Sequence, residues 1–236
     1  MSFDQKYYSS NKQNNDRLGL FFYSKVVNSY FKPTNVLDYG CGTGHFLKRL
    51  SKIKSVRKTF GLETSQYARD QVKINSVKSI IVSEINNIKE KSINLVTMLH
   101  VIEHLTDQEL SDIFHRLKTV MTPDGIIMIT TPAKNGLAHK IKKENWIGFK
   151  DNTHINLKKY NDWINFFHKN KIKLIKAGSD GLWDFPYKSL KNSFKILKIL
   201  FIMTIQIILG KLYLSYNEGE TFIFFLKFTD SQHINY

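Results

Sequence analysis

Short apolar runs alternate with longer amphipathic segments along most of this chain. Runs of apolar and β-branched residues predict strands at residues 35–38, 59–63, 79–82, 94–99, 125–130 and 171–177. Between them, the spacing of apolar positions predicts helices at residues 45–52, 65–74, 107–120 and 158–169. Strands that alternate with helices are typical of βαβ units, so we expect an α/β fold with a mostly parallel sheet.

The ends of the chain add further elements. Residues 1–31 are polar with scattered aromatics and carry a helical pattern at 18–30, so we expect an N-terminal helical segment ahead of a main domain at residues 32–236. Within that domain, residues 122–125 (Thr-Pro-Asp-Gly) predict a turn that begins the fifth strand. Aromatic and β-branched residues at 220–228 predict the last strand.

Residues 183–217 differ from the rest and predict a helical insertion before the last strand. Within 188–214, Lys188, Lys191, Lys195 and Lys198 recur at helical spacing and form one basic face. An apolar run at 199–209 follows, which is too short to span a bilayer, since a spanning helix takes about 20 residues. Two interpretations stay open: an interfacial helix on a membrane, which the lysines favour, and a helix buried in a homodimer or against the core.

Composition limits the possible functions of the chain less than the pattern of apolar and polar positions does. The 236 residues suit one α/β domain with additions, and the single cysteine, Cys41, excludes an internal disulfide framework. The first residues lack the apolar core of a signal peptide, so we expect a cytoplasmic protein, with membrane association if residues 188–214 bind lipid. The net charge of +15 comes mainly from abundant lysine, and we expect no nucleic-acid partner because no compact basic stripe with interleaved aromatics is present.

A glycine-rich loop carries the clearest chemical signal. A short strand ends at Asp38 and breaks into a loop with Gly40, Gly42 and Gly44, after which a helix pattern begins. Glycines at alternate positions let the backbone turn tightly and leave space for a ligand against the peptide. Glu63 ends the next strand, about 20 residues further on, where an acidic side chain can meet ribose hydroxyls.

These residues resemble a known family. D-Y-G-C-G-T-G-H-F resembles motif I of the class I S-adenosylmethionine-dependent methyltransferases, and G-L-E-T resembles their ribose-binding strand end. The resemblance implies a doubly wound, Rossmann-like, seven-stranded sheet with an antiparallel last strand, and S-adenosylmethionine as cofactor. It also implies an N-terminal segment that either folds over the cofactor or only packs on the core. The implied cofactor contacts are Asp38, Gly40, Cys41, Gly42, Gly44, Glu63, Thr64, Ser83, Glu84 and Leu99.

A second motif follows the fourth strand. The sequence H-V-I-E-H-L, with His100, Glu103 and His104, is similar to the E/H-x-x-E-H motif of ubiquinone-biosynthesis and small-RNA O-methyltransferases. In those families the motif and a later histidine bind a divalent metal, and His154 in W-I-G-F-K-D-N-T-H is such a histidine here. The implied metal ligands are therefore His100, Glu103, His104 and His154. Three imidazoles favour Zn²⁺, Mn²⁺ or Fe²⁺ over Mg²⁺.

Three roles for this motif stay open, and we rank them in order. The first is metal-free acid–base or positioning chemistry by His100, His104 and His154, because imidazole titrates near neutral pH. The second is the metal site, and the third is a purely structural turn. For function we favour O-methylation of a small-molecule or saccharide-type acceptor. The alternatives are an RNA methyltransferase and a non-catalytic protein that binds the cofactor.

Overall fold

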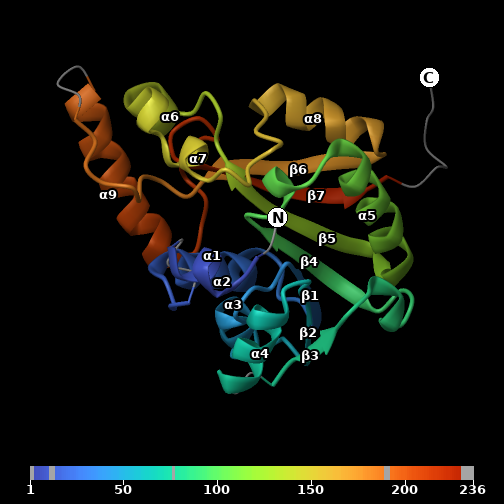
Figure 1. The fold of residues 1–236 in the computed structure, drawn as a ribbon. Coiled ribbons are helices and arrows are strands. Elements are labelled where there is room, and N and C mark those ends of the chain that lie inside the picture. Colours follow the sequence, from blue (N-terminus) through green and yellow to red (C-terminus); the bar gives the residue numbers. More distant parts are fainter. Residues whose placement is uncertain (1–2, 11–13, 76–77, 189–191, 230–236) are drawn as a thin grey trace, which may run out of the picture.

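The computed structural model describes residues 3–10, 14–75, 78–188 and 192–229, and within them the chain forms a seven-stranded sheet between helical layers (Figure 1). The strand order is β3-β2-β1-β4-β5-β7-β6. Strands β1 to β5 pair in parallel, and β7 runs antiparallel to both β5 and β6. The predicted fold class, including the antiparallel last strand, is confirmed.

The observed strands follow the predicted ones closely. They are β1 (Asn35–Tyr39), β2 (Lys58–Leu62), β3 (Ile80–Val82), β4 (Ile93–Leu99), β5 (Met121–Pro132), β6 (Ile172–Ser179) and β7 (Thr221–Phe228). The helices are α1 (Gln5–Ser10), α2 (Leu18–Tyr30), α3 (His45–Leu50), α4 (Gln66–Ile74), α5 (Asp107–Val120), α6 (Leu137–Lys142), α7 (Ile147–Lys150), α8 (Tyr160–Lys169) and α9 (Ser193–Leu209). Short 3₁₀ turns are η1 (Ile85–Asn87), η2 (Ile102–His104) and η3 (Lys143–Asn145).

The core has two layers because successive strand residues face opposite sides of the sheet. Leu37, on one side of β1, belongs to the cluster formed with α5 and α8. Val36, the preceding residue, belongs to the cluster formed with α2 and α3. Phe224 and Phe225 on β7 divide in the same way. Both faces of the sheet are therefore buried, as expected for a mostly parallel sheet with near-continuous apolar strands.

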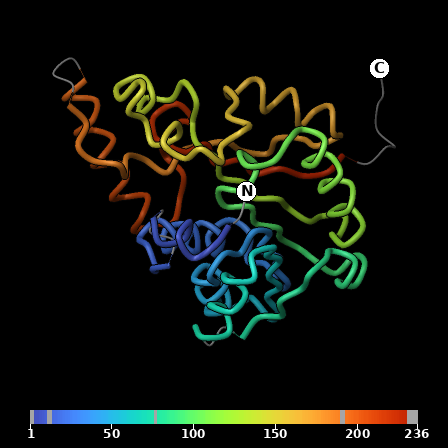
Figure 2. The backbone as a smooth tube through the Cα atoms, in the orientation of Figure 1, coloured from blue at the N-terminus to red at the C-terminus, as the bar shows by residue number. Residues whose placement is uncertain are grey.

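Helices α6, α7 and α9 form a separate group at one end of the molecule (Figure 2). A third cluster, in which Trp146, Leu182 and Ile199 are fully or almost fully buried, holds α9 against the segment of α6 and α7. None of the helices in the described residues is long and apolar enough to cross a membrane. One residue of the predicted basic face, Lys191, lies outside the described residues.

The structure corrects the prediction in three places. Within the insertion expected to be helical over residues 183–217, the described helix is α9 (Ser193–Leu209), and Lys188 lies before it without helical structure. The turn expected at residues 122–125 is part of β5, where it forms an irregularity between the paired residues Met121 and Ile126. The irregularity absorbs the extra residues without ending the strand. Helices α1, α6 and α7 were not predicted, because each has six residues or fewer and so is too short to show a clear period.

Candidate active site

The glycine loop lies at the carboxyl edge of the sheet, meaning the edge where β1, β2, β4 and β5 end. Gly40 has a φ of +75°, and Gly42 and Gly44 are also in the positive region. The amide of Gly40 donates to the Leu62 carbonyl at 2.8 Å, which ties the loop to the end of β2. A Cβ on Gly40 would lie 2.6 Å from a methyl group of Val101, so glycine is required here by both conformation and space.

Asp38 is buried directly beneath this loop. Its carboxylate accepts a hydrogen bond from the Thr97 hydroxyl of β4 at 2.7 Å. Burial raises the pKa of Asp38 to about 7, with a smaller contribution from the nearby Glu63. A buried carboxylate with one protein partner is suited to a ligand that brings a positive charge or an amino group.

Glu63 links the loop to the following helix. One carboxylate oxygen accepts the Gly42 amide at 2.9 Å, and the other accepts the Ser65 amide at 2.8 Å. Ser65 in turn caps α4, since its hydroxyl accepts the Ala68 amide. Each carboxylate oxygen retains a second lone pair for a sugar hydroxyl.

The remaining predicted cofactor contacts lie along the same edge. Cys41 is buried. Burial raises the pKa of its thiol, and the nearby carboxylates of Asp38 and Glu63 raise it further, which disfavours the nucleophilic thiolate at neutral pH. The others lie at the ends of β2, β3 and β4, where Thr64, Ser83 and Glu84 are exposed and Leu99 is half-buried. Their contacts with a cofactor stay predictions.

The N-terminal segment covers the loop. Tyr8 of α1 is almost fully buried, and its ring lies 3.6 Å from the position that a Cβ on Gly42 would take. Burial raises the pKa of Tyr8, as does the nearby Glu63 carboxylate. The Phe3 carbonyl accepts a hydrogen bond from the Ser65 hydroxyl. The sequence analysis noted the aromatics of this polar segment and left open whether the segment covers the cofactor, but it assigned none of them to the site.

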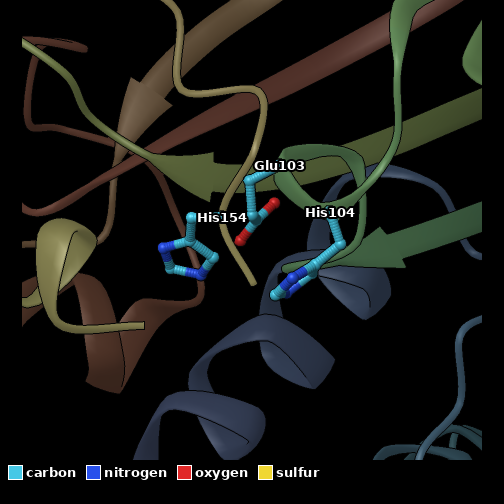
Figure 3. A group of neighbouring side chains, drawn as sticks. All are labelled: Glu103, His104 and His154. Atoms are coloured by element: carbon cyan, nitrogen blue, oxygen red, sulfur yellow. The ribbon is translucent and has the colours of Figure 1, made fainter. Parts of the chain in front are cut away.

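Glu103, His104 and His154 form a compact cluster beside the end of β4. Glu103 and His104 belong to η2, and His154 comes from the loop after α7. Each residue offers one ligand atom, and these atoms lie within 4.8 Å of one another. Figure 3 shows the Glu103 carboxylate pointing between the two imidazole rings, whose centroids are 4.8 Å apart.

The hydrogen bonds of the rings decide which nitrogens carry protons. His154 Nδ1 lies 2.8 Å from the Gly148 carbonyl oxygen. His104 Nδ1 lies 3.2 Å from the Thr153 carbonyl oxygen and 2.8 Å from the Thr153 hydroxyl oxygen, whose own hydrogen is donated to Asp151. A carbonyl oxygen only accepts, so each Nδ1 carries the hydrogen and each neutral ring keeps its lone pair on Nε2. Burial lowers the pKa of His104, while the adjacent Glu103 acts in the opposite direction. An imidazole Nε2 that keeps its lone pair can accept a proton or bind a cation, and the Nε2 of His154 lies 3.8 Å from Asp151 Oδ2.

Glu103 is the central acid of the cluster. It is completely buried, and its Oε2 has no hydrogen-bond partner within the described part of the chain. Burial raises the pKa of Glu103, but the hydrogen bond from His100 and the nearby rings of His104 and His154 lower it below its ordinary value. An ionised carboxylate with an unpartnered oxygen therefore faces the two histidines.

His100 lies beside the cluster and contacts Glu103. It has a φ of +55°, and its Nδ1 lies 3.1 Å from Glu103 Oε1. The compact cluster contains the other three predicted ligands but not His100. His100 thus contacts Glu103 on the side away from the unpartnered oxygen.

A second polar group at this edge was missed by the sequence analysis. Asp180 directly follows β6 and is buried, and it accepts a hydrogen bond from the Tyr23 hydroxyl of α2 at 2.7 Å. Its Oδ1 has no partner among the residues described. Burial raises the pKa of Asp180, and His100 is close enough to oppose that rise. Tyr23 and Asp180 are far apart in the sequence, so no local pattern joins them.

Comparison with protein families gives one match that covers most of the chain. The model of a family described as a methyltransferase domain matches residues 13–176. This range includes the glycine loop, Glu63 and the cluster of Glu103, His104 and His154. A search of curated proteins found no match.

Solved structures share the fold at low sequence identity. An S-adenosylmethionine-dependent methyltransferase from Archaeoglobus fulgidus is 18% identical, with a TM-score of 0.60 over 95% of this chain and 100% of that one. The plantazolicin methyltransferase BpumL in complex with SAH is 17% identical, with a TM-score of 0.65 over 97% of this chain and 91% of that one. The mitomycin 7-O-methyltransferase MmcR is 12% identical, with a TM-score of 0.58 over 89% of this chain and 54% of that one.

Proposed function

Since the chain belongs to the methyltransferase domain family, we propose that it transfers the methyl group of S-adenosylmethionine to a hydroxyl oxygen of a small-molecule or saccharide-type acceptor. The family match and the SAH-bound relatives support S-adenosylmethionine as the cofactor, as the sequence predicted. The observation that carries hydroxyl specificity is the acceptor-rich cluster of Glu103, His104 and His154. An oxygen nucleophile must lose a proton on methylation, and this cluster is built to receive one.

The chain's own residues divide the work between two groups. Asp38, Glu63 and the glycine loop hold the cofactor, with Asp38 facing its amino group and Glu63 its ribose hydroxyls. Bound S-adenosylmethionine supplies an electrophilic methyl group whose transfer leaves a thioether. The cluster positions the acceptor hydroxyl, and Nε2 of His104 or His154 takes its proton as the new carbon–oxygen bond forms. The proton then leaves the imidazolium to solvent.

Substitution of the two histidines tests this proposal. In His104→Gln and His154→Gln, we expect kcat to fall by about 10²–10⁴-fold, the usual contribution of a positioned general base. SAH affinity, measured by calorimetry, should stay within error of the wild type. His115→Gln, an exposed histidine on α5, is the matched control. Full activity of both cluster variants would overturn the base assignment, and absence of SAH binding by the wild type would overturn the function.

A divalent metal in the same cluster is the second candidate. The unpartnered Oε2 of Glu103 and the imidazoles of His104 and His154 fit such an ion, with His100 orienting Glu103 through its other oxygen. A bound cation would lower the pKa of the acceptor hydroxyl. Elemental analysis of the purified protein and activity after EDTA treatment separate the two mechanisms: full activity with EDTA and no bound ion would exclude the metal.

The proposal also specifies the class of molecule that accepts the methyl group. One structural relative is an O-methyltransferase by name and another is a plantazolicin methyltransferase, so the relatives leave the acceptor open. An RNA acceptor and a non-catalytic role stay as alternatives. Incubation with labelled S-adenosylmethionine and panels of sugars, phenols and RNA distinguishes the three. The proposed location is the cytoplasm, where the lone Cys41 stays reduced.

A further inference from the structure

Helix α9 is apolar on two opposite sides, although only one of them is covered. Its buried side is formed by Ile196, Ile199, Met203 and Gln206. At 100° per residue these positions occupy one face of the helix. A helix that is apolar all round is normally buried all round.

The buried side fixes α9 firmly to the rest of the molecule. Its apolar residues pack in the cluster that contains Trp146 and Leu182. The buried Gln206 side chain donates to the Ser179 carbonyl at the end of β6 and accepts the amides of Tyr213 and Leu214. The opposite face of α9 therefore has a definite orientation, at the end of the molecule away from α5 and α8 (Figure 1).

That opposite face is an exposed apolar stripe, which consists of Phe194, Leu197, Phe201 and Ile208. Phe194 is 87% exposed and Phe201 is 69% exposed, and Leu197 and Ile208 are also well exposed. The spacing of three, four and seven residues aligns them along one side of the helix. Exposure of a row of large apolar side chains to water is unfavourable, and such a row indicates a surface that binds a protein or a membrane.

The charged residues of α9 are both positive. Lys195 and Lys198 are exposed on the same helix, and Lys188 is exposed before it. At 100° per residue, Lys198 borders the stripe, whereas Lys195 lies between the stripe and the buried side. In the sequence, no acidic residue occurs between Asp184 and Glu218. Lysines on the same helix as an exposed apolar face match an anionic lipid surface, in which the apolar side chains enter the acyl region and the long lysine side chains reach the headgroups.

We propose that the exposed stripe of α9, with Lys195 and Lys198, docks this protein on the surface of an anionic lipid bilayer. A second copy of the chain fits the same face less well. In a two-fold dimer the patch meets itself, so the lysines of the two copies would lie close together without acidic partners. Lysine is also depleted in the buried centres of protein interfaces.

The helix proposed to dock is linked to the candidate active site through one segment of the chain. Trp146, which packs against α9, begins the same segment that ends at His154. If the proposed function holds, docking would favour an acceptor that is itself held at a membrane surface. This consequence rests on the proposed function, whereas the docking itself does not.

Vesicle co-sedimentation of the full chain tests the docking. The probes are vesicles of phosphatidylcholine alone and of phosphatidylcholine mixed with phosphatidylglycerol, at low and high salt. Leu197→Ser/Phe201→Ser should weaken binding to the anionic vesicles by about tenfold or more, because two large apolar side chains are lost from the stripe. Lys195→Gln/Lys198→Gln should weaken binding to the anionic vesicles by about fivefold for each lysine. High salt should also weaken this binding, because it screens the charges.

The control is Ile74→Ser on α4, because Ile74 is 69% exposed, like Phe201, but lies outside the stripe. This variant should bind vesicles as the wild type does. SAH affinity and melting temperature, measured for every variant, show that the fold is kept, and analytical ultracentrifugation gives the oligomeric state. The proposal is overturned if the wild type does not bind anionic vesicles, or if Leu197→Ser/Phe201→Ser binds them as strongly as the wild type does. It is also overturned if that variant instead dissociates a wild-type dimer.

Discussion

At the scale of single residues, three buried carboxylates at the carboxyl edge have three different sets of neighbours. Asp38 has one hydroxyl partner, and burial raises its pKa to about 7. Glu63 accepts two backbone amides. Glu103 is surrounded by histidines, which overcome its burial and lower its pKa. The neighbours thus suit Asp38 to binding a cationic ligand, Glu63 to anchoring the loop, and Glu103 to accepting a proton or a metal ion.

Asp38→Asn should separate stability from cofactor binding. The raised pKa of Asp38 means that the folded protein holds this proton more tightly than the unfolded chain. Stability associated with the group is therefore complete below about pH 4 and is lost as pH rises to about 7. Asparagine keeps an acceptor for Thr97 without the buried charge. At pH 8 we expect the melting temperature to rise by about 2–4 °C or more, with little change at pH 4.

The same variant should bind S-adenosylmethionine at least about tenfold more weakly, since a charged hydrogen bond is lost. Calorimetry at pH 8 gives the affinity, and thermal melts from pH 4 to 8 give the stability. An unchanged affinity would remove Asp38 from the cofactor site. A melting temperature below that of the wild type at pH 8 would contradict the assigned direction of its pKa.

At the scale of elements, the site depends on a strand, a loop and a helix meeting in one narrow space. The loop after β1 is held from two sides, by the Leu62 carbonyl and by Glu63, while Val101 closes it from the end of β4. The glycines of the loop therefore differ in the space that is available for a side chain. Gly40 faces a methyl group at 2.6 Å, whereas the nearest atom to a Cβ on Gly42 is 3.6 Å away.

Gly40→Ala should consequently cost more stability than Gly42→Ala. Both substitutions place a side chain at positive φ, which costs about 1–2 kcal/mol. Gly40→Ala adds an overlap with Val101, for which we expect about 1–3 kcal/mol more. Chemical denaturation measures both values. The double variant Gly40→Ala/Val101→Ala should recover part of the difference, and equal losses for the two single variants would contradict the close approach.

At the scale of the whole molecule, the first described segment joins the two functional groups. Tyr8 lies over the glycine loop, and Phe3 stacks edge-on with His104 at 5.7 Å between ring centroids. The Tyr7 hydroxyl donates to Asp151 at 3.4 Å, three residues before His154. One short segment therefore contacts both the predicted cofactor loop and the histidine cluster, and it is placed to shield them from water.

Removal of residues 1–10 should reveal this role. We expect the shortened chain to keep its fold, because the core clusters of the sheet are formed without α1. Its SAH affinity should fall by about tenfold, mainly through faster dissociation, since Tyr8 no longer covers the loop. Stopped-flow dissociation and calorimetry measure this effect, with Lys6→Ala, an exposed residue of α1, as the control. Tighter binding by the shortened chain would mean that the segment excludes the cofactor.

Much of the fold could be predicted because its signals are local. The capping pair Thr106 and Glu109 and the apolar spacing after them define α5 at the predicted residues 107–120. The strands were found from short apolar runs, and the glycine loop from its need for positive φ. The turn at 122–125 was wrong because Pro123 and Gly125 also fit a strand irregularity, which only pairing with β4 reveals.

The sequence by itself determined the order of the elements, the glycine loop and the identity of the acids at the strand ends, because these depend on neighbours within a few residues. Only the tertiary structure decided which side chains meet. It gathered Glu103, His104 and His154, turned His100 towards Glu103 Oε1, and joined Tyr23 to Asp180 across 157 positions. It also decided which face of α9 is covered. Such contacts depend on how distant segments pack, and no local pattern of residues encodes that packing alone.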